Sequence, residues 1–300
     1  MAAAALPQAA TIERALEGIG NHVYFAGDVV VRLGTGSDAA MFPRSVAMMR
    51  AAKPTVRVPE VLFADCSRAR FEVPVMVLER MPGTTLKRLW PTLSAGERLD
   101  LIADVASQLG RLHAIEPTDV LCAGFTTPWW RERVSRIERL LAELRPHPEF
   151  PDAWFDTMAR YVDEHRDALT SSPAAAPLHN DVNFGNVLVA DGQVTALLDF
   201  DDALCGPPEE DWWQLVARCD EAVPPLPLEL LPQIPEFDLS ADGVLERFQI
   251  GEIQNTLDLL SGELSWVEPA TAVLEARETY EATFESSEHE RLLARLAQPK

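Results

Sequence analysis

Short runs of β-branched and aromatic residues dominate the first eighty residues of the chain. Four of these runs predict strands: His22–Phe25, Val29–Leu33, Val61–Ala64 and Val73–Leu78. The first two are separated by Ala26-Gly27-Asp28, a glycine-containing segment that predicts a hairpin. Met41–Ala52 has helical spacing and stops short of Pro54, because residues before proline avoid the helical region. We therefore expect a small β-rich region with one helix at the start of the chain.

The pattern becomes helical after Pro82-Gly83. Ser94–Ile115 carries apolar residues at every third or fourth position and begins with Ser-Ala-Gly-Glu, a capping-box sequence. The remaining elements are helices at Trp129–Leu144, Ala153–Leu169 and from Ser240 onward, a loop at Ser171–Pro177 and a proline-rich segment at Val223–Pro235. This pattern predicts an α+β protein with a small β-rich N-terminal lobe, residues 1–81, and a larger, mainly helical C-terminal lobe, residues 82–300. Clefts between two such lobes commonly bind ligands.

A second hairpin is predicted within the helical part of the chain. Its strands are Asn186–Val189 and Val194–Phe200, and Asp191-Gly192 between them is a strong turn signal. The segment before it, His179–Asn186, has the H-x-D-x-x-x-x-N spacing that kinases use. Asp and Asn in loops often do no more than cap a turn, so this spacing alone is weak. The apolar hairpin and the Asp-Phe that follow it favour the functional interpretation.

Asp181, Asn186 and Asp199 are residue types that phosphoryl transfer needs. The reaction requires metal ions to neutralise developing charge, a group that orients the attacking hydroxyl, and a clamp on the phosphates. Asp181 can accept the hydroxyl proton, while Asn186 and Asp199 offer the hard oxygen ligands that Mg²⁺ prefers. We interpret His179 as a residue that shapes the loop rather than as the base.

The stretch PLHNDVNFGNVLVADGQVTALLDFDDALCGPPEEDWW, residues 177–213, resembles the catalytic segment of the aminoglycoside phosphotransferase family, which also includes choline-kinase-like enzymes. The segments at 58–64, 77–83 and 109–117 also resemble that family, so the resemblance spans most of residues 16–215. It implies a protein-kinase-like bilobal fold, ATP or GTP in the cleft, Mg²⁺, and phosphorylation of a hydroxyl group on a small molecule. It implies that Asp181 is the catalytic base and that Asn186 and Asp199 are the metal ligands. It also implies a structural role for Asp211.

The resemblance extends to the N-terminal, nucleotide-binding lobe. Gly18-Ile19-Gly20-Asn21 occupies the place of the loop that covers the phosphates, which makes Gly18, Gly20 and Asn21 candidate nucleotide-binding residues. A plain structural turn remains open for this segment. Arg32 stands where kinases carry a phosphate-binding lysine, and a solvated strand arginine is its alternative. Glu79 and Met81 bound the linker whose backbone would meet the nucleobase.

One family feature is missing from the predicted helix. In the family this helix carries a glutamate that pairs with the basic residue of the strand, but Ser45 stands at the matching position. Met41–Ala52 contains no acidic residue at all. Either another group orients Arg32, or the ion pair is absent.

Composition narrows the choice of partner. The chain has 300 residues, of which 47% are hydrophobic and 24% charged, as in soluble globular proteins, and its formal net charge is -21. Such a charge disfavours nucleic acid as a partner. Residues 199–300 hold 23 Asp and Glu against 6 Lys and Arg, which would attract a cation to this part of the chain. Acidity that serves only solubility is the alternative.

We therefore favour a cationic hydroxyl compound as substrate, such as an aminoglycoside-type antibiotic, which would connect the chain to antibiotic resistance, or an amino alcohol. A sugar or homoserine remains open. The candidate acids for substrate amines are Asp220, Glu221, Glu252, Asp258 and Glu263, with solvated surface acids as the alternative. The four cysteines are scattered and no apolar run is long enough to cross a membrane, so we expect a cytoplasmic protein without a membrane partner.

Two other functions are compatible with parts of this pattern. A pseudokinase that binds nucleotide as a scaffold or sensor would explain the missing glutamate, but it has no chemical need for Asp181, Asn186 and Asp199 together. A haloacid-dehalogenase-like phosphatase would use Asp199 as nucleophile and Asp201 as acid. We reject this class, because it needs a downstream lysine and Lys300 is the only lysine after Asp201, and because a helical segment rather than a Rossmann-like domain follows.

Overall fold

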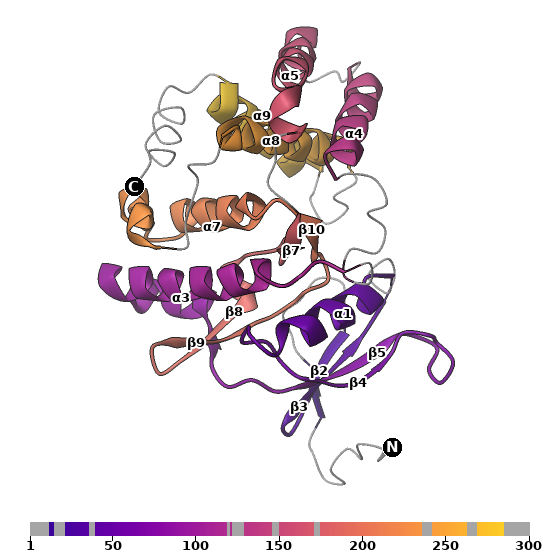
Figure 1. The fold of residues 1–300 in the computed structure, drawn as a ribbon, viewed down its shortest axis with the longest axis vertical. Helices are drawn as coiled ribbons and strands as arrows, with labels where there is room; N and C mark the ends of the chain where they lie inside the picture. Colours follow the sequence, from indigo (N-terminus) through magenta and orange to yellow (C-terminus); the bar gives the residue numbers. More distant parts are fainter. Residues whose placement is uncertain are drawn as a thin grey trace. The chain divides into compact units, whose positions relative to one another are not determined.

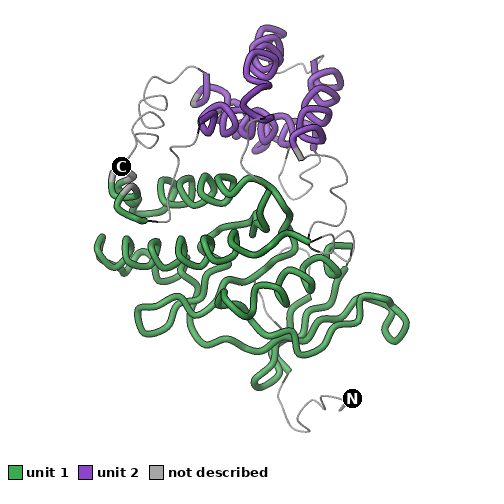
Figure 2. Tube along the Cα trace, viewed as in Figure 1, with its two compact units in different colours: residues 1–124, 175–236 green, residues 125–174, 237–300 purple. Residues whose placement is uncertain are grey.

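The fold divides into two compact units, each formed from two separate stretches of chain. In this computed structural model the described residues are 12–14, 22–35, 40–118, 121, 129–145, 150–170, 175–235, 242–262 and 269–284. Unit 1 comprises residues 1–124 and 175–236, and unit 2 comprises residues 125–174 and 237–300 (Figure 2). The lobe boundary predicted between residues 81 and 82 falls inside unit 1, and the assignment of lobes remains a prediction.

Unit 1 begins with a five-stranded antiparallel sheet of order β1-β2-β3-β5-β4 (Figure 1). Its strands are β1 Ile12–Arg14, β2 His22–Ala26, β3 Val29–Leu33, β4 Val61–Asp65 and β5 Val75–Glu79. The β2–β3 hairpin turns at Gly27-Asp28, where Gly27 has a φ of 60° that favours glycine. All four predicted strands are present. β1, whose three residues are all exposed, carries no apolar run that would have predicted it.

Helix α1, Phe42–Ala52, buries one face within unit 1. Its buried residues include Phe42, Ser45 and Met48, which recur at helical spacing. Lys53 caps the end of the helix, and its Nζ donates to the carbonyl of Val58 over 3.0 Å. The predicted helix is therefore confirmed, one residue shorter at its start.

The chain leaves the sheet through a tight bend at Gly83. Its φ of +125° is one that glycine adopts but residues with a side chain rarely do. A Cβ at this position would also lie 2.6 Å from the carbonyl oxygen of Val189. The bend leads into β6 Thr84–Thr85, α2 Leu86–Leu89, the 3₁₀ turn η2 Trp90–Thr92 and α3 Ala95–His113. The predicted capping box is present: Glu97 N–H donates to Ser94 Oγ, and Ser94 N–H donates to the Glu97 carboxylate.

The second part of unit 1 holds the predicted hairpin. Its elements are β7 Ala176–Leu178, η3 Phe184–Asn186, β8 Val187–Ala190, β9 Gln193–Leu197, β10 Leu204–Gly206, α7 Glu209–Glu221 and η4 Leu228–Gln233. Strands β6, β8 and β9 form one sheet, and β7 pairs with β10. The prediction of a loop over Ser171–Pro177 is wrong at its end, because Ala176 and Pro177 pair with β10. The strand predicted to run to Phe200 ends at Leu197.

An arginine–aspartate pair fastens the β8–β9 hairpin to α3. Arg57 Nη1 lies 2.8 Å from Asp104 Oδ2 on α3 and donates to the carbonyl of Val194 over 2.7 Å. The same Asp104 oxygen accepts the N–H of Val194 over 2.9 Å. Leu197 N–H donates to the carbonyl of Arg57, which adds a backbone bond to the same junction. These bonds fix the strand that leads into Asp199.

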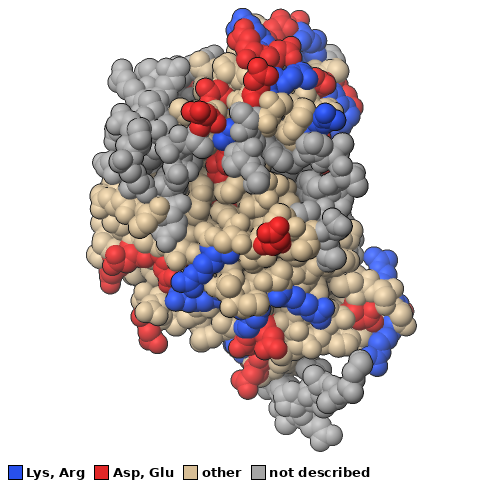
Figure 3. All heavy atoms as spheres, viewed as in Figure 1, with Lys and Arg blue, Asp and Glu red and all other residues tan. Residues whose placement is uncertain are grey.

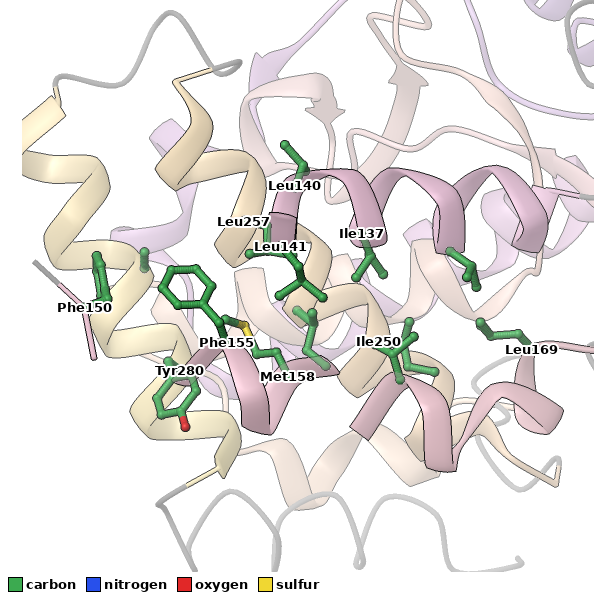
Figure 4. Packing of buried hydrophobic residues seen from close by; sticks show 14 residues of the cluster. Ile137, Leu140, Leu141, Phe150, Phe155, Met158, Leu169, Ile250, Leu257 and Tyr280 are labelled. Carbon is green, nitrogen blue, oxygen red and sulfur yellow. The ribbon is translucent and has the colours of Figure 1, made fainter. Parts of the chain in front are cut away.

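Unit 2 is helical in the part that the structure describes. Its helices are α4 Trp129–Leu144, α5 Asp152–Glu164, α6 Arg166–Thr170, α8 Val244–Ser261 and α9 Pro269–Phe284. They enclose a continuous apolar cluster that includes Ile137, Phe155 and Ile250 (Figure 4). The single helix predicted over Ala153–Leu169 is interrupted at His165, where the backbone leaves the helical region.

Basic side chains balance only part of the acidity that was predicted for the C-terminal part (Figure 3). On the face drawn in Figure 3, the helices of unit 2 display acidic and basic side chains side by side. Asp258, a candidate for binding substrate amines, is buried and lies 2.9 Å from Arg136. No helix in the described part of the chain is long and apolar enough to cross a membrane. Cys66 and Cys219 are free, whereas Cys205 is disulfide-bonded, so the expectation of scattered thiols does not hold for every cysteine.

Candidate active site

Asp211, at the start of α7, holds the backbone of the loop that carries Asp181. One Asp211 oxygen accepts the backbone N–H of His179 over 3.0 Å, and the other accepts that of Asn180 over 2.8 Å. His113 Nε2, at the end of α3, lies 2.8 Å from Asp211 Oδ2. Burial would raise the pKa of Asp211, but the hydrogen bond from His113 and the charge beside it lower the pKa below 3.8 overall. Asp211 is thus a buried carboxylate that organises the loop.

His179 is a structural member of this loop. Its Nδ1 accepts the N–H of Asp181 over 3.3 Å, and its Nε2 faces the carbonyl of Leu198 at 2.8 Å. A carbonyl can only accept, so Nε2 carries a hydrogen. The side chain is buried against Phe200, at 4.6 Å between ring centroids. These contacts join the Asp181 loop to the chain just before Asp199, which agrees with the interpretation of His179 as a shaping residue.

The carboxylate of Asp181 is held by two amides. Asn183 Nδ2 donates to Oδ1 over 2.9 Å, and Asn186 Nδ2 donates to Oδ2 over 2.7 Å. Asn183 is fixed in turn, because its Oδ1 accepts the N–H of Gly185 over 2.8 Å. Each carboxylate oxygen can accept more than one hydrogen bond, so Asp181 keeps acceptor capacity for a hydroxyl. The carboxylate is therefore oriented before any substrate arrives.

Asp199 occupies a backbone conformation that is rare for residues with a side chain. Its φ is 62°, in the left-handed region that Asp tolerates better than most residues. This turn ends β9 and explains why the strand is shorter than predicted. Asp199 Oδ1 accepts from Arg32 Nη2 over 3.1 Å. The structure thus brings Asp199 together with Arg32, which lies 167 residues earlier in the chain.

Arg32 has a second, closer partner in Asp201. Its Nη2 donates to Asp201 Oδ2 over 2.7 Å, and both residues are buried. The guanidinium also lies over the ring of Phe42 on α1, at 5.6 Å from the centroid. The alternative of a solvated strand-edge arginine is therefore wrong. The ion pair that the acid-free helix could not supply is made by an aspartate that follows β9.

Asp181, Asp199, Asp201 and Asp202 form an acidic cluster. Asp202 lies at the surface, yet partial burial of its carboxyl and repulsion by the other three carboxylates raise its pKa. Arg44 opposes this rise. A concentration of negative charge of this kind favours the binding of a cation between or beside the carboxylates.

The donor atoms around this cluster fit a magnesium ion of the kind that kinases use. The Asn186 amide directs its Nδ2 at Asp181, which leaves its Oδ1 as a neutral oxygen donor. Asp199 offers a carboxylate that is 43% exposed. The described residues contain no group of three or more His, Cys, Asp or Glu arranged to hold a metal ion. One amide and one carboxylate are still sufficient for Mg²⁺, which keeps waters and takes phosphate oxygens.

The predicted nucleotide-binding residues fall in different places. Gly18, Gly20 and Asn21 lie outside the described residues. Glu79 ends β5 with its carboxylate 2.9 Å from Lys53 Nζ, a hydrogen bond that lowers the pKa of Glu79. Its backbone N–H donates to the carbonyl of Glu60. The side chain of Glu79 is therefore engaged by Lys53 within the N-terminal region. Within the described residues, the backbone N–H and C=O of Met81 form no hydrogen bond.

Several residues of the site were not predicted for the roles that their contacts indicate. They are His113, which contacts Asp211, Asn183, which contacts Asp181, Asp201, which contacts Arg32, and Arg44, which contacts the backbone of Asp201. Asn183 could have been noticed because it lies two residues after Asp181 in the same loop. The others are distant in sequence from their partners, and no local pattern marks them.

An antiparallel sheet, a linker and an aspartate-bearing loop ahead of a hairpin define a protein-kinase-like phosphotransferase fold. Residues 11–240, which are most of the chain, match the model of the phosphotransferase enzyme family APH, and the chain belongs to this family. It is thus a small-molecule kinase, as predicted. No curated protein matches the chain.

Solved structures share this fold at low identity. The ADP-bound aminoglycoside phosphotransferase APH(2'')-Ib is 14% identical, with a TM-score of 0.68 over 90% of this chain and 92% of that one. The GDP complex of aminoglycoside 2'-phosphotransferase-IIIa is 16% identical, with a TM-score of 0.69 over 91% and 92%. A choline/ethanolamine kinase family protein from Mesorhizobium loti is 19% identical, with a TM-score of 0.60 over 96% and 92%. The predicted fold class is confirmed, and the pseudokinase alternative gains no support.

Proposed function

We propose that the chain transfers the γ-phosphate of ATP or GTP to a hydroxyl group of a small cationic molecule, with Asp181 as the catalytic base. The observation that carries this proposal is the fixed carboxylate of Asp181, which two amides orient within the same cluster as Asp199 and Arg32. A base that is oriented in advance spends no free energy on reorganisation during the reaction.

The reaction assigns a step to each part of the site. The acceptor oxygen attacks the γ-phosphorus, the bond from that phosphorus to the β–γ bridging oxygen breaks, and ADP or GDP leaves. The hydroxyl proton passes to a carboxylate oxygen of Asp181. Asn186 and Asp199 would hold Mg²⁺, which neutralises charge on the phosphates when it is bound.

The remaining predicted residues would bind the nucleotide. Arg32 would contact its phosphates, Gly18, Gly20 and Asn21 would cover them, and the backbone of the linker from Glu79 to Met81 would meet the base. Similar folds have been solved with GDP and, in APH(2'')-IIa, with ATP and streptomycin, so both nucleotides belong in the assay. We place the reaction in the cytoplasm, because nucleoside triphosphates are its co-substrates.

Charge favours a cationic acceptor. Asp181 shares its surroundings with three other carboxylates, and residues 199–300 have 17 more acidic than basic residues. Such a field raises the local concentration of cations and repels anionic hydroxyl compounds. Structures of the same fold were solved with kanamycin and gentamicin, and another belongs to a choline/ethanolamine kinase family protein, which gives the first acceptors to test.

The test is an acceptor panel with ATP and GTP, read by nucleoside diphosphate release and by the mass of the acceptor. It contains aminoglycosides, choline, ethanolamine, neutral sugars and homoserine, each with the wild type and with Asp181→Asn. We expect a cationic acceptor to gain one phosphate and Asp181→Asn to lose this activity. Good transfer to neutral sugars alone would disprove the charge argument. Tight nucleotide binding without transfer to any acceptor would instead favour the pseudokinase.

An antibiotic substrate would also have a cellular consequence. If an aminoglycoside is the acceptor, a susceptible bacterium that expresses the chain should grow at higher concentrations of that compound. The strain expressing Asp181→Asn is the matched control, because the two proteins differ by one oxygen and one nitrogen atom. Equal growth of the two strains would show that phosphate transfer by the chain does not confer resistance to that compound.

A further inference from the structure

Two carboxylates share one nitrogen of Arg32. Nη2 lies 2.7 Å from Asp201 Oδ2 and 3.1 Å from Asp199 Oδ1. The Asp201 side chain is 13% exposed, whereas that of Asp199 is 43% exposed. Water screens the longer and more exposed contact more strongly. Arg32 is therefore anchored on Asp201 and held only weakly by Asp199.

Helix α1 fixes this anchor from the other side. Arg44 Nη2 donates to the backbone carbonyl of Asp201 over 3.2 Å, and Phe42 supports the guanidinium of Arg32. Ser45, which stands where the family glutamate is expected, is buried and its hydroxyl contacts no partner in the described structure. The helix thus contacts Arg32 directly through Phe42 and acts on its acidic partner through Arg44, without an acid of its own.

We propose that Asp201 is the positioning residue for Arg32, in place of the missing helix glutamate, and that it keeps the bond from Arg32 to the metal ligand Asp199 the weaker of the two. With Asp201 present, the guanidinium stays near the phosphates while Asp199 remains available to Mg²⁺. This inference rests on the proposed function, because it assigns Arg32 to the phosphates and Asp199 to the metal.

Loss of Asp201 has a specific consequence. The Asp199 carboxylate is then the remaining partner of Arg32 in the pair of bonds described above, so the arginine competes with Mg²⁺ for it. Removing Arg32 as well abolishes this competition. Asp201→Asn should therefore raise the magnesium requirement only while Arg32 is present, which a merely structural role of Asp201 would not produce.

The experiment is a double-mutant cycle of Asp201→Asn and Arg32→Met. ATP and GTP binding is measured by calorimetry over a series of Mg²⁺ concentrations, and thermal unfolding shows that each variant is folded at the assay temperature. We expect Asp201→Asn to raise the Mg²⁺ concentration for half-saturation about tenfold. In the double variant, the Mg²⁺ concentration for half-saturation should lie within about threefold of the value for Arg32→Met alone. In transfer assays, the nucleotide KM should rise while the acceptor KM stays constant.

Asp202→Asn is the matched control, since it removes the same charge one residue further along. We expect its effect on the Mg²⁺ requirement to be the same with and without Arg32. Arg44→Gln, which leaves both carboxylates in place, should shift the requirement in the same direction as Asp201→Asn but less. The proposal is overturned if the effects of Asp201→Asn and Arg32→Met multiply independently, or if neither Asp201→Asn nor Arg44→Gln changes the requirement. A failure of the proposed function is seen separately, as absence of transfer by the wild type.

Discussion

Asn186 donates from Nδ2 to Oδ2 of Asp181 across 2.7 Å and to the Asp181 carbonyl across 3.2 Å. The residue that we propose as a metal ligand therefore also orients the proposed base. Any change that moves one of these groups moves the other, so substitutions of Asn186 cannot separate proton transfer from metal binding. Asp181, Asn183 and Asp199 are the better positions for tests of single functions.

Substitution of the base should remove transfer without removing the nucleotide. Asp181→Asn keeps the size of the side chain but cannot accept the proton, so we expect kcat to fall about 10²–10⁴-fold. Nucleotide affinity, measured by calorimetry, should change little. Asp191→Asn is the control, because Asp191 lies in the exposed β8–β9 turn at a φ of 51° that Asn also tolerates. Transfer by Asp181→Asn at the wild-type rate would disprove the assignment.

Asn183 should matter for rate rather than for binding. Asn183→Ala removes the donor to Asp181 Oδ1 and the acceptor of Gly185 N–H, so we expect kcat to fall about tenfold with an unchanged nucleotide KM. Asn183→Asp places a like charge 2.9 Å from the same oxygen and should be worse than Asn183→Ala. The order of the two variants is the informative result, and the reverse order would show that Asn183 does not orient the base.

Phosphate transfer should require Mg²⁺, and Asp199 should set how much Mg²⁺ is needed. A chelator should abolish transfer by the wild type, and added Mg²⁺ should restore it, because the two protein oxygen donors need a metal to hold the phosphates. Asp199→Asn should raise the Mg²⁺ concentration for half-maximal nucleotide binding about tenfold or more, as expected for lost charge at a metal ligand. Full activity in the presence of chelator would contradict the proposed metal site.

Asp211 should stabilise the fold in a pH-dependent way. Asp211→Asn removes a buried negative charge that accepts from two backbone N–H groups and contacts His113, so we expect a loss of about 2–4 kcal/mol in the free energy of unfolding. The folded-state pKa lies below 3.8, so this contribution is complete above that pH and is lost as the pH falls through the folded-state pKa. Denaturant unfolding from pH 7 down to about pH 3 should show the two proteins converging at the acid end. A difference in the free energy of unfolding that stays constant over this pH range would show that Asp211 is not ionised in the folded protein.

Gly83 and Gly96 should respond oppositely to alanine. A Cβ at Gly83 would meet the Val189 carbonyl at 2.6 Å in a backbone with a φ of +125°, so Gly83→Ala should cost about 1–3 kcal/mol. Nothing lies within 4 Å of a Cβ at Gly96 near the start of α3, where alanine should stabilise the protein by up to about 1 kcal/mol. Thermal unfolding of the two variants checks both signs, and equal shifts would contradict the described bend.

The sequence predicted the elements whose patterns are local. The β8–β9 hairpin follows from two apolar runs on either side of Asp191-Gly192, and the start of α3 follows from Ser94 and Glu97. The three polar residues that we propose for the centre of the site could be proposed from the sequence because they lie close together along the chain around one turn. The end of β9 was misplaced, because the left-handed conformation of Asp199 is fixed by contacts and not by residue type.

The partner of Arg32 could not be predicted for a different reason. Asp201 lies 169 residues from Arg32, and both are embedded in segments whose own patterns point elsewhere. An aspartate in a D-F-D-D sequence indicates metal binding at least as readily as an ion pair. Only the three-dimensional approach of β3 to the segment after β9 distinguishes the two. The same limit applies to His113 and Asp211, which lie 98 residues apart.

The division of the chain into two units has a consequence for how such enzymes change. Asp181, Asn186, Asp199, Arg32 and Asp201 all belong to unit 1, which the chain leaves after residue 124 and re-enters at residue 175. Unit 2 is thus an insertion joined to a C-terminal extension, with an apolar cluster of its own. Mutations can accumulate in the helices of unit 2 without altering any of these five residues of the proposed site. A lineage can in this way vary the helices of unit 2 while the residues proposed for phosphoryl transfer stay unchanged, and a protein engineer can exchange the inserted helices to test whether they determine the acceptor.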